Sequence, residues 1–381
     1  MGTMEKVEAK LTTLCYIEKN DSYLMLHRNK KKKDLSADMW IGVGGHFEKW
    51  ESPSECLLRE VKEETGLTLT SYKLRGIVTF LYSEETEAEG IGNRRDIQNP
   101  RDIGDVSEFE YMFLYTADVF TGSIRECDEG ELEFIRKDKL KTLYFWTGDE
   151  IFLKLIENDY PFFDLKLTYK GKTLRRAILD GKELELFDIL DENYEPTGIV
   201  RERSIVHERG DWHRTVHIWV VRVAEGKMEV LLQKRAANKD SFPGCYDISS
   251  AGHIQAGDDY ETSALRELFE ELGIKAAAEE LELVGTHKTE CHSRFYGKPF
   301  INREYSNVYI YDATGKNLQW KLQKEEVETV MWIEYEAGTK ELEEGTLENC
   351  ILMDEWSMIG EWLKQHKQYC EQTNAMYIQE V

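Results

Sequence analysis

The chain has 381 residues and a formal net charge of −24, from 73 acidic and 49 basic side chains. This length predicts two domains, and 41% apolar residues are enough to build real cores. A protein this acidic is not expected to bind nucleic-acid polymers or membrane surfaces, but a small phosphorylated substrate can still bind through a shared Mg²⁺ ion.

The first six residues, MGTMEK, contain no apolar signal-peptide core, and the seven cysteines are scattered without a Cys-x-x-Cys pair. The longest apolar runs are strand-sized and too short to cross a membrane. We therefore expect a cytoplasmic protein without a disulfide framework or a zinc knuckle.

Apolar runs in the first half predict β-strands on both sides of one helix. The turn-like residues 20–21 separate the first two strands, and a helix is expected over 54–65, between Pro53 and Gly66. The expected strands are 11–16, 23–27, 73–82 and 110–119.

Three further segments complete the first half. The polar run 84–108 is expected to form a long loop, either a surface insertion or a lid over a substrate. Residues 161–179 predict a β-hairpin turning at 170–171, and 180–181 marks the end of the first domain. The expected domains are 1–181 and 182–381.

The second half repeats this order of elements. Two strands surround the turn at 225–226, and a closing helix is expected over 353–365 with Met358, Trp362 and Leu363 on one side. The expected strands are 217–223, 228–233, 281–287 and 306–311.

One pattern occurs twice, 207 residues apart. Residues 45–67 read GHFEKWESPSECLLREVKEETGL, and residues 252–274 read GHIQAGDDYETSALRELFEELGI. Both contain Gly, five residues, an acid, seven residues, and then Arg-Glu-apolar-x-Glu-Glu-x-Gly-apolar. A repeat of this length indicates two related α/β domains (α+β sandwiches), each a mixed β-sheet flanked by helices.

In the first copy, Glu60, Glu63 and Glu64 are spaced i, i+3, i+4, so their carboxylates share one helix face. Such a face needs a cation, and hard carboxylate oxygens suit Mg²⁺ or Mn²⁺. Arg59 is expected to pair with Glu51 and fix the preceding loop to the helix.

The glycines at the start of the pattern, Gly44 and Gly45, let the backbone come close to a metal or a phosphate, and Gly252 is the counterpart in the second copy. On the opposite side of the first helix, facing the core, we expect Leu57, Leu58 and Val61.

In the second copy, Glu267, Glu270 and Glu271 repeat the acidic face, with Arg266 and Asp258 as the expected ion pair. A solvated charged helix is the alternative for either copy alone. Two full matches at equivalent positions argue against that alternative.

Both segments match the signature of the Nudix hydrolase family, with Asp258 where the family usually has Glu. The resemblance implies two tandem Nudix folds and Mg²⁺-dependent cleavage of a diphosphate linked to another group. The metal ligands that it implies are Gly45 (through its carbonyl), Glu60, Glu63, Glu64, Gly252, Glu267, Glu270 and Glu271. The catalytic candidates among them are Glu63, Glu64, Glu270 and Glu271.

The first domain resembles the MutT-like 8-oxo-dGTP diphosphatases in TTLCYIEKNDSYLMLHR, MWIGVGGHFE and YFWTGDEIFLKLI. The resemblance implies that Trp146 stacks on a purine, that Asp149 hydrogen-bonds its edge, and that Glu129 is a further catalytic candidate that assists the metal or the base. A core aromatic is the alternative for Trp146. Arg28 opens a basic run and is a candidate for binding substrate phosphates, with a solvated loop as the alternative. Human-type enzymes have a purine-reading Asn where this chain has Ile41.

The second domain resembles isopentenyl-diphosphate-isomerase-like Nudix proteins in ELFDILDENYEPTGIVRERSIVHERGDWHRTVHIWVV and LLQKRAANKDSFPGCYDISSAGHI. True isomerases have a catalytic Cys where this chain has Ala251, and they lack the full acidic helix, so hydrolysis is expected. Glu304 falls near their second catalytic glutamate, with Asn302 at the partner position. Isomerase metal ligands match approximately His207, His213 and His253, for which a structural role is the alternative.

These resemblances predict a bifunctional Nudix pyrophosphohydrolase. The first domain is expected to hydrolyse (oxidised) purine nucleoside triphosphates such as 8-oxo-dGTP to monophosphate and pyrophosphate, in nucleotide-pool sanitation, and the second to cleave a different diphosphate. The alternatives are that one domain is a non-catalytic nucleotide sensor, or that the second is an isomerase. The expected partners are small-molecule nucleotide or diphosphate substrates and Mg²⁺ or Mn²⁺.

Overall fold

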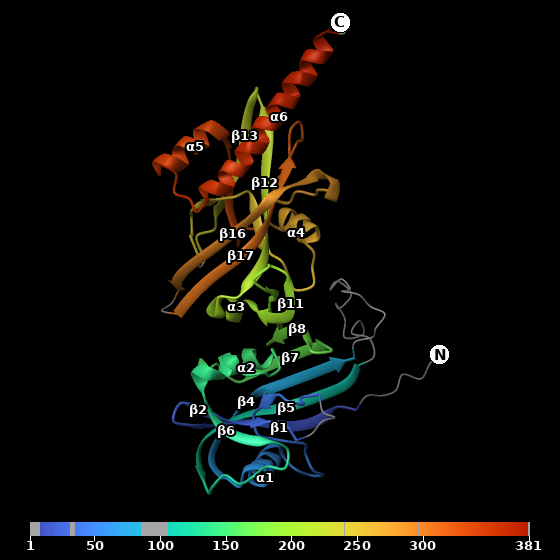
Figure 1. The fold of residues 1–381 in the computed structure, drawn as a ribbon, viewed down its shortest axis with the longest axis vertical. Coiled ribbons are helices and arrows are strands. Elements are labelled where there is room, and N and C mark those ends of the chain that lie inside the picture. The colour runs from blue at the N-terminus through green and yellow to red at the C-terminus, as the bar shows by residue number, and fades with distance from the viewer. Residues whose placement is uncertain (1–7, 31–34, 85–105, 240, 296–297, 380–381) are drawn as a thin grey trace, which may run out of the picture. The chain divides into compact units, whose positions relative to one another are not determined.

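The structure is a computed structural model that describes residues 8–30, 35–84, 106–239, 241–295 and 298–379. The chain forms two compact units, and each is a mixed β-sheet flanked by helices, as predicted (Figure 1). Most of the expected loop 84–108 lies outside the described residues. Domain one is Met1–Leu186 with Gly198–Ile205, and domain two is Phe187–Thr197 with Val206–Val381.

Domain one contains, in chain order, β1 (Lys10–Lys19), β2 (Ser22–His27), β3 (Trp40–Ile41), α1 (Pro53–Thr65), β4 (Thr68–Ser83), β5 (Val106–Thr121), β6 (Glu131–Arg136), the short helix η3 (Lys137–Thr142), α2 (Asp149–Glu157), β7 (Phe163–Lys170), β8 (Thr173–Leu179) and β9 (Lys182–Glu183). The strand order is β3-β2-β1-β5-β4-β7-β8-β9, and β6 pairs with β2. The pairs β1–β5 and β4–β7 are parallel. The hairpin expected over 161–179 is β7 and β8, which extend this sheet.

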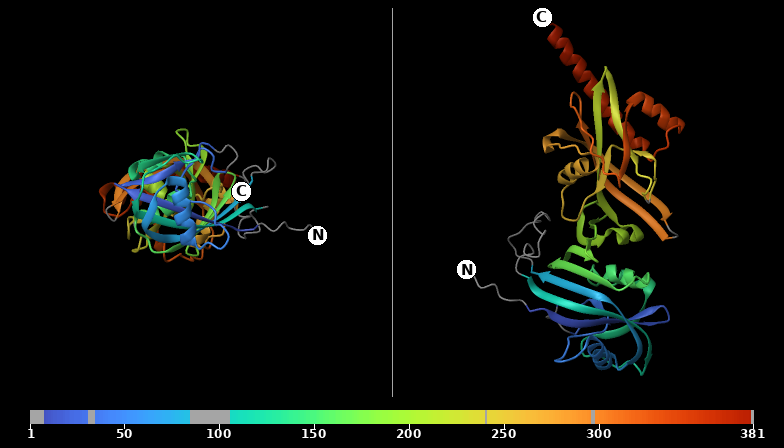
Figure 2. Two further views of the ribbon diagram at one scale, coloured as in Figure 1. Left: turned by 90° about the horizontal axis from the view of Figure 1, so that it is seen from below. Right: turned by 180° about the vertical axis from the view of Figure 1, so that it is seen from behind.

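Alternation along β1 assigns the two helices of domain one to opposite faces of the sheet. Cys15 and Ile17 join the core cluster that includes Leu57 of α1. Tyr16 points the other way and contacts Phe152 of α2, with ring centroids 6.0 Å apart. Figures 1 and 2 show α1 and α2 on the two sides of the sheet. The sheet is therefore covered on both faces, and each face can carry its own site.

Helix α1 has strong start and stop signals. The Ser52 hydroxyl accepts the Glu55 backbone N–H, and the Glu55 carboxylate accepts the Ser52 backbone N–H at 2.8 Å. Pro53 stands in the first turn, and Gly66 ends the helix in the left-handed conformation, with φ 79°. These signals place the helix at the predicted residues.

The buried stripe of α1 is narrower than predicted. Leu57, Val61 and Thr65 are buried and follow one another at intervals of four residues. Leu58 is 36% exposed, because the next residue along a helix is turned by about 100° from the stripe. The expectation that Leu58 faces the core was wrong.

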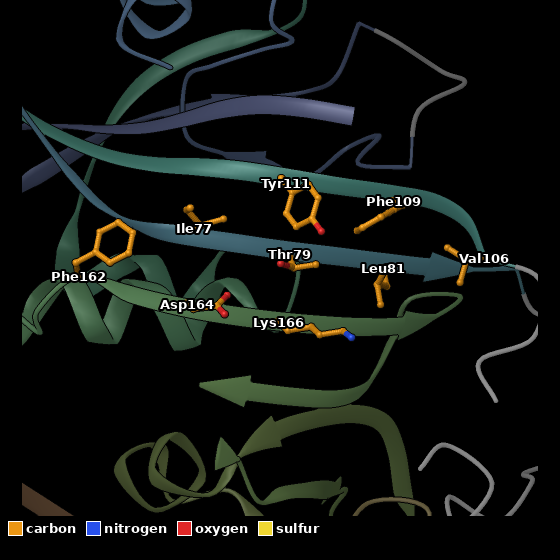
Figure 3. A pocket seen from close by; sticks show the side chains of 9 residues that line it. All are labelled: Ile77, Thr79, Leu81, Val106, Phe109, Tyr111, Phe162, Asp164 and Lys166. Carbon is orange, nitrogen blue, oxygen red and sulfur yellow. The ribbon is translucent and has the colours of Figure 1, made fainter. Parts of the chain in front are cut away.

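A largely apolar groove of about 660 Å³ lies on β4, β5 and β7 (Figure 3). Ile77 and Leu81 line it and point away from the face where Phe80 packs against Trp146. The only charged side chains among its lining residues are Asp164 and Lys166, so it contains no cluster of acids.

Domain two contains β10 (Leu186–Leu190), β11 (Pro196–Glu202), α3 (Arg203–Arg209), β12 (Trp212–Ala224), β13 (Lys227–Arg235), β14 (Tyr246–Asp247), β15 (Ser250–His253), α4 (Tyr260–Leu272), the short helix η4 (Ala278–Glu280), β16 (Leu281–Phe295), β17 (Lys298–Asp312), β18 (Val327–Glu334), α5 (Tyr335–Glu344) and α6 (Met353–Gln379), where β10, β11 and α3 cross the domain boundary. The main sheet has the order β14-β13-β12-β17-β16, with β15 on β12 and β18 on β13. The central pair β12–β17 is parallel.

The sheet of domain two also separates two cores. Val216 of β12 packs in the cluster that includes Leu268 of α4. On the other face, Trp219 packs against Trp356 of α6, with ring centroids 5.6 Å apart. Helix α6 begins at Met353, as predicted, and continues past the expected end at 365. In the described part of the chain, no helix is long and apolar enough to span a membrane.

The hairpin turns between β1 and β2 and between β12 and β13 are formed by residues that tolerate positive φ. Asn20 and Asp21 have φ values of 50° and 58°, and Glu225 and Gly226 have 51° and 77°. Two such residues in sequence match the right-handed twist of the strands that they join. The turn positions predicted for both domains are confirmed.

Candidate active sites

In domain one, the loop before α1 brings two glycines against the acidic helix face. The Gly45 carbonyl oxygen accepts the Thr13 N–H of β1 at 2.9 Å, whereas the Gly44 N–H donates to Glu64 Oε2 at 3.1 Å. The Gly44 N–H therefore faces the acids, and the Gly45 carbonyl faces β1. A Cβ at Gly45 would lie 2.5 Å from the carboxylate carbon of Glu60, so this glycine makes room for that side chain.

Arg59 organises the exposed part of the acidic face. Its Nε and one terminal nitrogen donate to the two carboxylate oxygens of Glu51 at 2.6 and 2.8 Å, which confirms the predicted ion pair. The other terminal nitrogen donates to Glu60 at 2.7 Å and to Glu63 at 3.1 Å. The hydrogen bonds from Arg59 hold the pKa of Glu51 at about 2. One guanidinium therefore ties the loop to the helix and fixes the direction of two metal-ligand candidates.

Glu64 is the buried member of the acidic face. Burial raises its pKa to about 8, and the negative charges of Glu129 and Glu60 add to the shift. Arg28 lies 3.2 Å from Glu129, as an ion pair. The structure thus places Arg28 and Glu129, two residues predicted from the sequence, beside the helix face.

The donor set of domain one fits a divalent cation. Glu60, Glu63, Glu64 and Glu129 supply hard oxygen atoms, which Mg²⁺ and Mn²⁺ prefer. Burial, together with the negative charges of Glu129 and Glu60, penalises the ionised form of Glu64. A bound divalent cation would favour that ionised form.

Domain two repeats the arrangement around Arg266. A Cβ at Gly252 would lie 2.1 Å from the carboxylate carbon of Glu267. Arg266 lies 2.9 Å from Glu267 and 3.5 Å from Glu270, and it donates to the His253 carbonyl at 3.3 Å. The three predicted ligand positions therefore share the environment of their counterparts in domain one.

The predicted pair of Arg266 with Asp258 is not found among the described residues. The Asp258 side chain is one methylene shorter than that of Glu51, its equivalent in domain one. This prediction was wrong, and Arg266 is held by the helix acids instead.

Glu271 occupies the buried position of the second acidic face. It accepts the Ser250 hydroxyl at 2.6 Å and the Ala251 backbone N–H at 3.2 Å, as Glu64 accepts the backbone N–H of Gly44. Burial raises the pKa of Glu271 to about 8, and Glu326 is among the negative charges that add to the shift. Lys239 forms an ion pair with Glu326.

Glu326 is a candidate that the sequence reasoning missed. It directly precedes β18, the strand that pairs with β13, and Glu129 similarly stands just before β6, the strand that pairs with β2. Each of these acids pairs with a cation and acts on the buried glutamate of its helix. An acid just before the strand that pairs with the second strand of the domain (β18 with β13, β6 with β2) was the sequence signal that could have identified Glu326.

Trp146 and Asp149 lie on the α2 side of the sheet in domain one. Trp146 is 7% exposed, its indole N–H donates to Ser36 Oγ at 3.0 Å, and its ring meets Tyr169 and Phe80 edge to face at 4.8 and 5.4 Å. Burial raises the pKa of Asp149 well above its ordinary value of 3.8. The structure brings the two residues together in an aromatic, water-poor environment.

In domain two, three histidines named from the isomerase resemblance also converge. His207, His213 and His253 each place a ring nitrogen within 4.8 Å of the others. Glu304 lies 3.5 Å from His253 and 4.0 Å from His213. The stacked ring of Phe187 covers His253, with centroids 4.7 Å apart.

Comparison with known proteins identifies the family. The sequence profile of the NUDIX domain matches residues 9–156 and 211–349, three quarters of the chain in two regions. The chain belongs to the Nudix family. The two matches show that its Nudix domains are in tandem, and Nudix hydrolases generally use divalent metal ions.

Named relatives add little about the substrate. Nudix hydrolase 3 of Arabidopsis thaliana is 45% identical over 154 residues, which are 40% of this chain and 19% of that protein. An uncharacterized Nudix hydrolase of Clostridium acetobutylicum is 42% identical over 152 residues, 40% of this chain and 71% of that protein. A crystal structure of a MutT protein from Bacillus halodurans is 24% identical and covers 45% of this chain and 97% of that one, with a TM-score of 0.36. The match to the Arabidopsis protein spans about a fifth of its length, so its activity is not transferred to this chain.

Proposed function

We propose that both domains are Mg²⁺-dependent pyrophosphohydrolases. The observation that carries the proposal is the duplicated site: a glycine that makes room for a glutamate, an arginine that orients two acids, and a buried glutamate with a pKa of about 8. A bound ion would supply charge neutralisation at the phosphoryl oxygens and a lowered pKa for the attacking water. The residues that would hold it are Glu60, Glu63, Glu64, Glu267, Glu270 and Glu271.

We propose that the backbone carbonyl that binds the metal together with these acids is not the predicted Gly45 carbonyl. Gly44 faces Glu64, whereas Gly45 is turned towards β1. Ala251 faces Glu271 in the same way. The carbonyls of Gly44 and Ala251 are therefore our candidates, and Gly45 and Gly252 have a steric role.

We propose that an acid outside the helix accepts the proton of the attacking water in each domain. Glu129, held by Arg28, and Glu326, held by Lys239, are placed beside the two buried glutamates. A carboxylate near the attacking water can act as its general base. We assign both acids this role.

For domain one we propose purine nucleoside triphosphates, including oxidised ones such as 8-oxo-dGTP. Trp146 offers a large ring, and Asp149, whose neutral form is favoured because burial raises its pKa, can donate a hydrogen bond to the edge of a base. Stacking requires that the ring of Trp146 leave its contact with Ser36. The sequence of domain two resembles a different branch of the family, so we assign it a different diphosphate.

Hydrolysis is favoured over isomerisation in domain two. The cluster of His207, His213, His253 and Glu304 resembles an isomerase metal site. Ala251 cannot replace the thiol of the catalytic cysteine, and the acidic face on α4 is complete. We therefore propose water, not the substrate double bond, as the reacting partner.

The experiment is turnover of the full chain with Mg²⁺, measured as phosphate after added inorganic pyrophosphatase. For nucleotide sugars, which release two phosphomonoesters and no pyrophosphate, it is measured as phosphate after added alkaline phosphatase. Substrates are 8-oxo-dGTP, dGTP, pyrimidine triphosphates, nucleotide sugars and isoprenyl diphosphates. Glu63→Gln should abolish triphosphate hydrolysis only, and Glu270→Gln should abolish only the activity of domain two. Each variant is the matched control for the other. Triphosphate turnover that survives Glu63→Gln would remove domain one as its source, and no turnover by the wild type would favour a nucleotide sensor.

A further inference from the structure

Two histidines and a glutamate from distant parts of the chain converge in domain two, on the face of the sheet opposite α4. They come from β12 (His217), β16 (His287) and the first turn of α6 (Glu355). His217 Nδ1 lies 2.9 Å and His287 Nδ1 lies 3.4 Å from the same carboxylate oxygen, Glu355 Oε2. Little of this cluster is open to solvent, because His287 and Glu355 are buried and His217 is largely covered.

We propose that these three atoms bind one transition-metal cation of the Zn²⁺ class. Imidazole nitrogen with carboxylate oxygen is a donor set that Zn²⁺ takes in proteins, whereas Mg²⁺ prefers oxygen alone. A tetrahedral ion with bonds of about 2.0–2.1 Å keeps its ligands roughly 3.3–3.4 Å apart. The observed separations of 2.9 and 3.4 Å are close to that spacing.

The outward atoms of the three side chains are held by further groups. His287 Nε2 lies 3.1 Å from Asp354 Oδ2, and His217 Nε2 lies 3.4 Å from the Ser306 hydroxyl. The other oxygen of Glu355 accepts the indole N–H of Trp219 at 2.7 Å. Histidines that bind metals commonly donate their second nitrogen to a carboxylate or another acceptor, which fixes the ring and its tautomer. The surroundings therefore orient both imidazoles towards one point.

The alternative is an ion-pair network without metal. In that network, His217 carries a proton and donates it to Glu355, while Thr289 Oγ1 lies 3.2 Å from His287 Nδ1. Both arrangements would join the first turn of α6 to β12 and β16. Only the metal site predicts a bound cation, and neither arrangement depends on the proposed hydrolysis.

The test is the metal content of the full chain. After removal of metals with a chelator, the protein is dialysed against Co²⁺ in excess Mg²⁺, which occupies the acidic helices. Bound Co²⁺ is counted by mass spectrometry, and its visible absorption reports nitrogen ligands. The wild type should bind one equivalent more than His287→Gln or Glu355→Gln, and the absorption of that equivalent should be lost with it.

His292→Gln is the matched control, because His292 lies on the same strand but is exposed and pairs with Glu290. It should retain the full Co²⁺ content. Thermal unfolding in chelator checks that the variants fold, and His217→Gln is the second removal variant if His287→Gln fails. Equal Co²⁺ content in the wild type and every folded removal variant would overturn the proposal and leave the ion-pair network.

Discussion

The two domains can be compared residue by residue along their central strands. Gly45 bonds to Thr13 of β1, and Gly252 pairs with Val216 of β12, so these strands share a common register. Thr13 and Val216 face the acidic helices, α1 and α4. The next residues, Leu14 and His217, face the later helices, α2 and α6. The acidic faces are alike, and the opposite faces differ.

On the opposite faces, two apolar residues of domain one are replaced by polar residues in domain two, and one aromatic residue is replaced by another. Leu14 and Tyr16 of β1 correspond to His217 and Trp219 of β12. The strand beside them changes in the same way, since Ser306 of β17 stands where β5 has an apolar residue. Two similar acidic faces are thus combined with opposite faces of different composition.

Each surface receives one buried acid from its helix, and the pKa values of these two acids shift in opposite directions. Burial raises the pKa of Asp149 of α2 well above its ordinary value and so favours its neutral form. Burial also opposes ionisation of Glu355 of α6, but the charge and hydrogen bond of His217 overcome it and hold the pKa of Glu355 below its ordinary value. A neutral acid among aromatic rings suits an uncharged base, whereas an ionised acid with histidines suits a cation.

The largest predicted effect tests the acidic faces, which are alike in the two domains. Gly45→Ala should reduce triphosphate hydrolysis roughly 100-fold, because the new Cβ displaces the carboxylate of Glu60 by about 1 Å or more. The fold should survive, since that carboxylate is the end of a flexible side chain. Gly252→Ala should do the same to the activity of domain two through Glu267.

Steady-state kinetics of both variants and circular dichroism check this prediction, and each variant is the control for the other domain. Full activity in either folded variant would show that its glutamate is not positioned by the glycine. Unfolding would mean that the glycine matters for the backbone and not for the site.

The second prediction uses the two buried acids and has opposite signs. At pH 7, Asp149→Asn should raise the stability of domain one. Burial makes ionisation of the Asp149 carboxyl costly, as its raised pKa indicates, whereas the amide of Asn carries no charge. Glu355→Gln should lower the stability of domain two by about 3 kcal/mol, because it leaves the charge of His217 unpaired. Calorimetry in chelator resolves the two unfolding transitions.

The pH dependence distinguishes these causes. Wild-type domain one should lose stability relative to Asp149→Asn as pH rises above 3.8, by up to about 1.4 kcal/mol per pH unit, because only the unfolded chain releases the proton. The advantage of wild-type domain two over Glu355→Gln should be present above pH 4.5 and be lost as pH falls through the lowered pKa of Glu355. Parallel pH profiles for wild type and variant would contradict the assigned charge states.

The sequence predicted what local spacing determines. The helix limits, the acidic faces and the pair of Arg59 with Glu51 all depend on residues within about one loop and one helix. The same spacing failed for Asp258, where one missing methylene changes the partner of Arg266. Spacing also could not show that Gly45 faces β1, because this orientation depends on pairing with a distant strand.

Local spacing could not predict which distant residues converge, and only resemblance to known families pointed to Glu129 and to the group of His207, His213 and His253. Glu326 follows Glu271 by 55 residues, and His217, His287 and Glu355 meet only through the register of long strands. Strand register is set by the packing of whole faces, and a shift of one residue would turn each histidine to the other face. Such clusters become visible only in the folded domain.

The smallest predicted effect concerns the contact that holds Trp146. Ser36→Ala should lower the stability of domain one by about 1 kcal/mol, because the buried indole N–H loses its acceptor. If a base must displace this contact, the same variant should bind purine triphosphates up to about fivefold more tightly, with little change for pyrimidines. Thr339→Ala is the matched control, since it removes the acceptor of the Trp356 indole N–H in domain two and should leave this affinity unchanged. Weaker purine binding by Ser36→Ala would mean that the contact forms part of the pocket, and equal effects on all bases would remove Trp146 from base recognition.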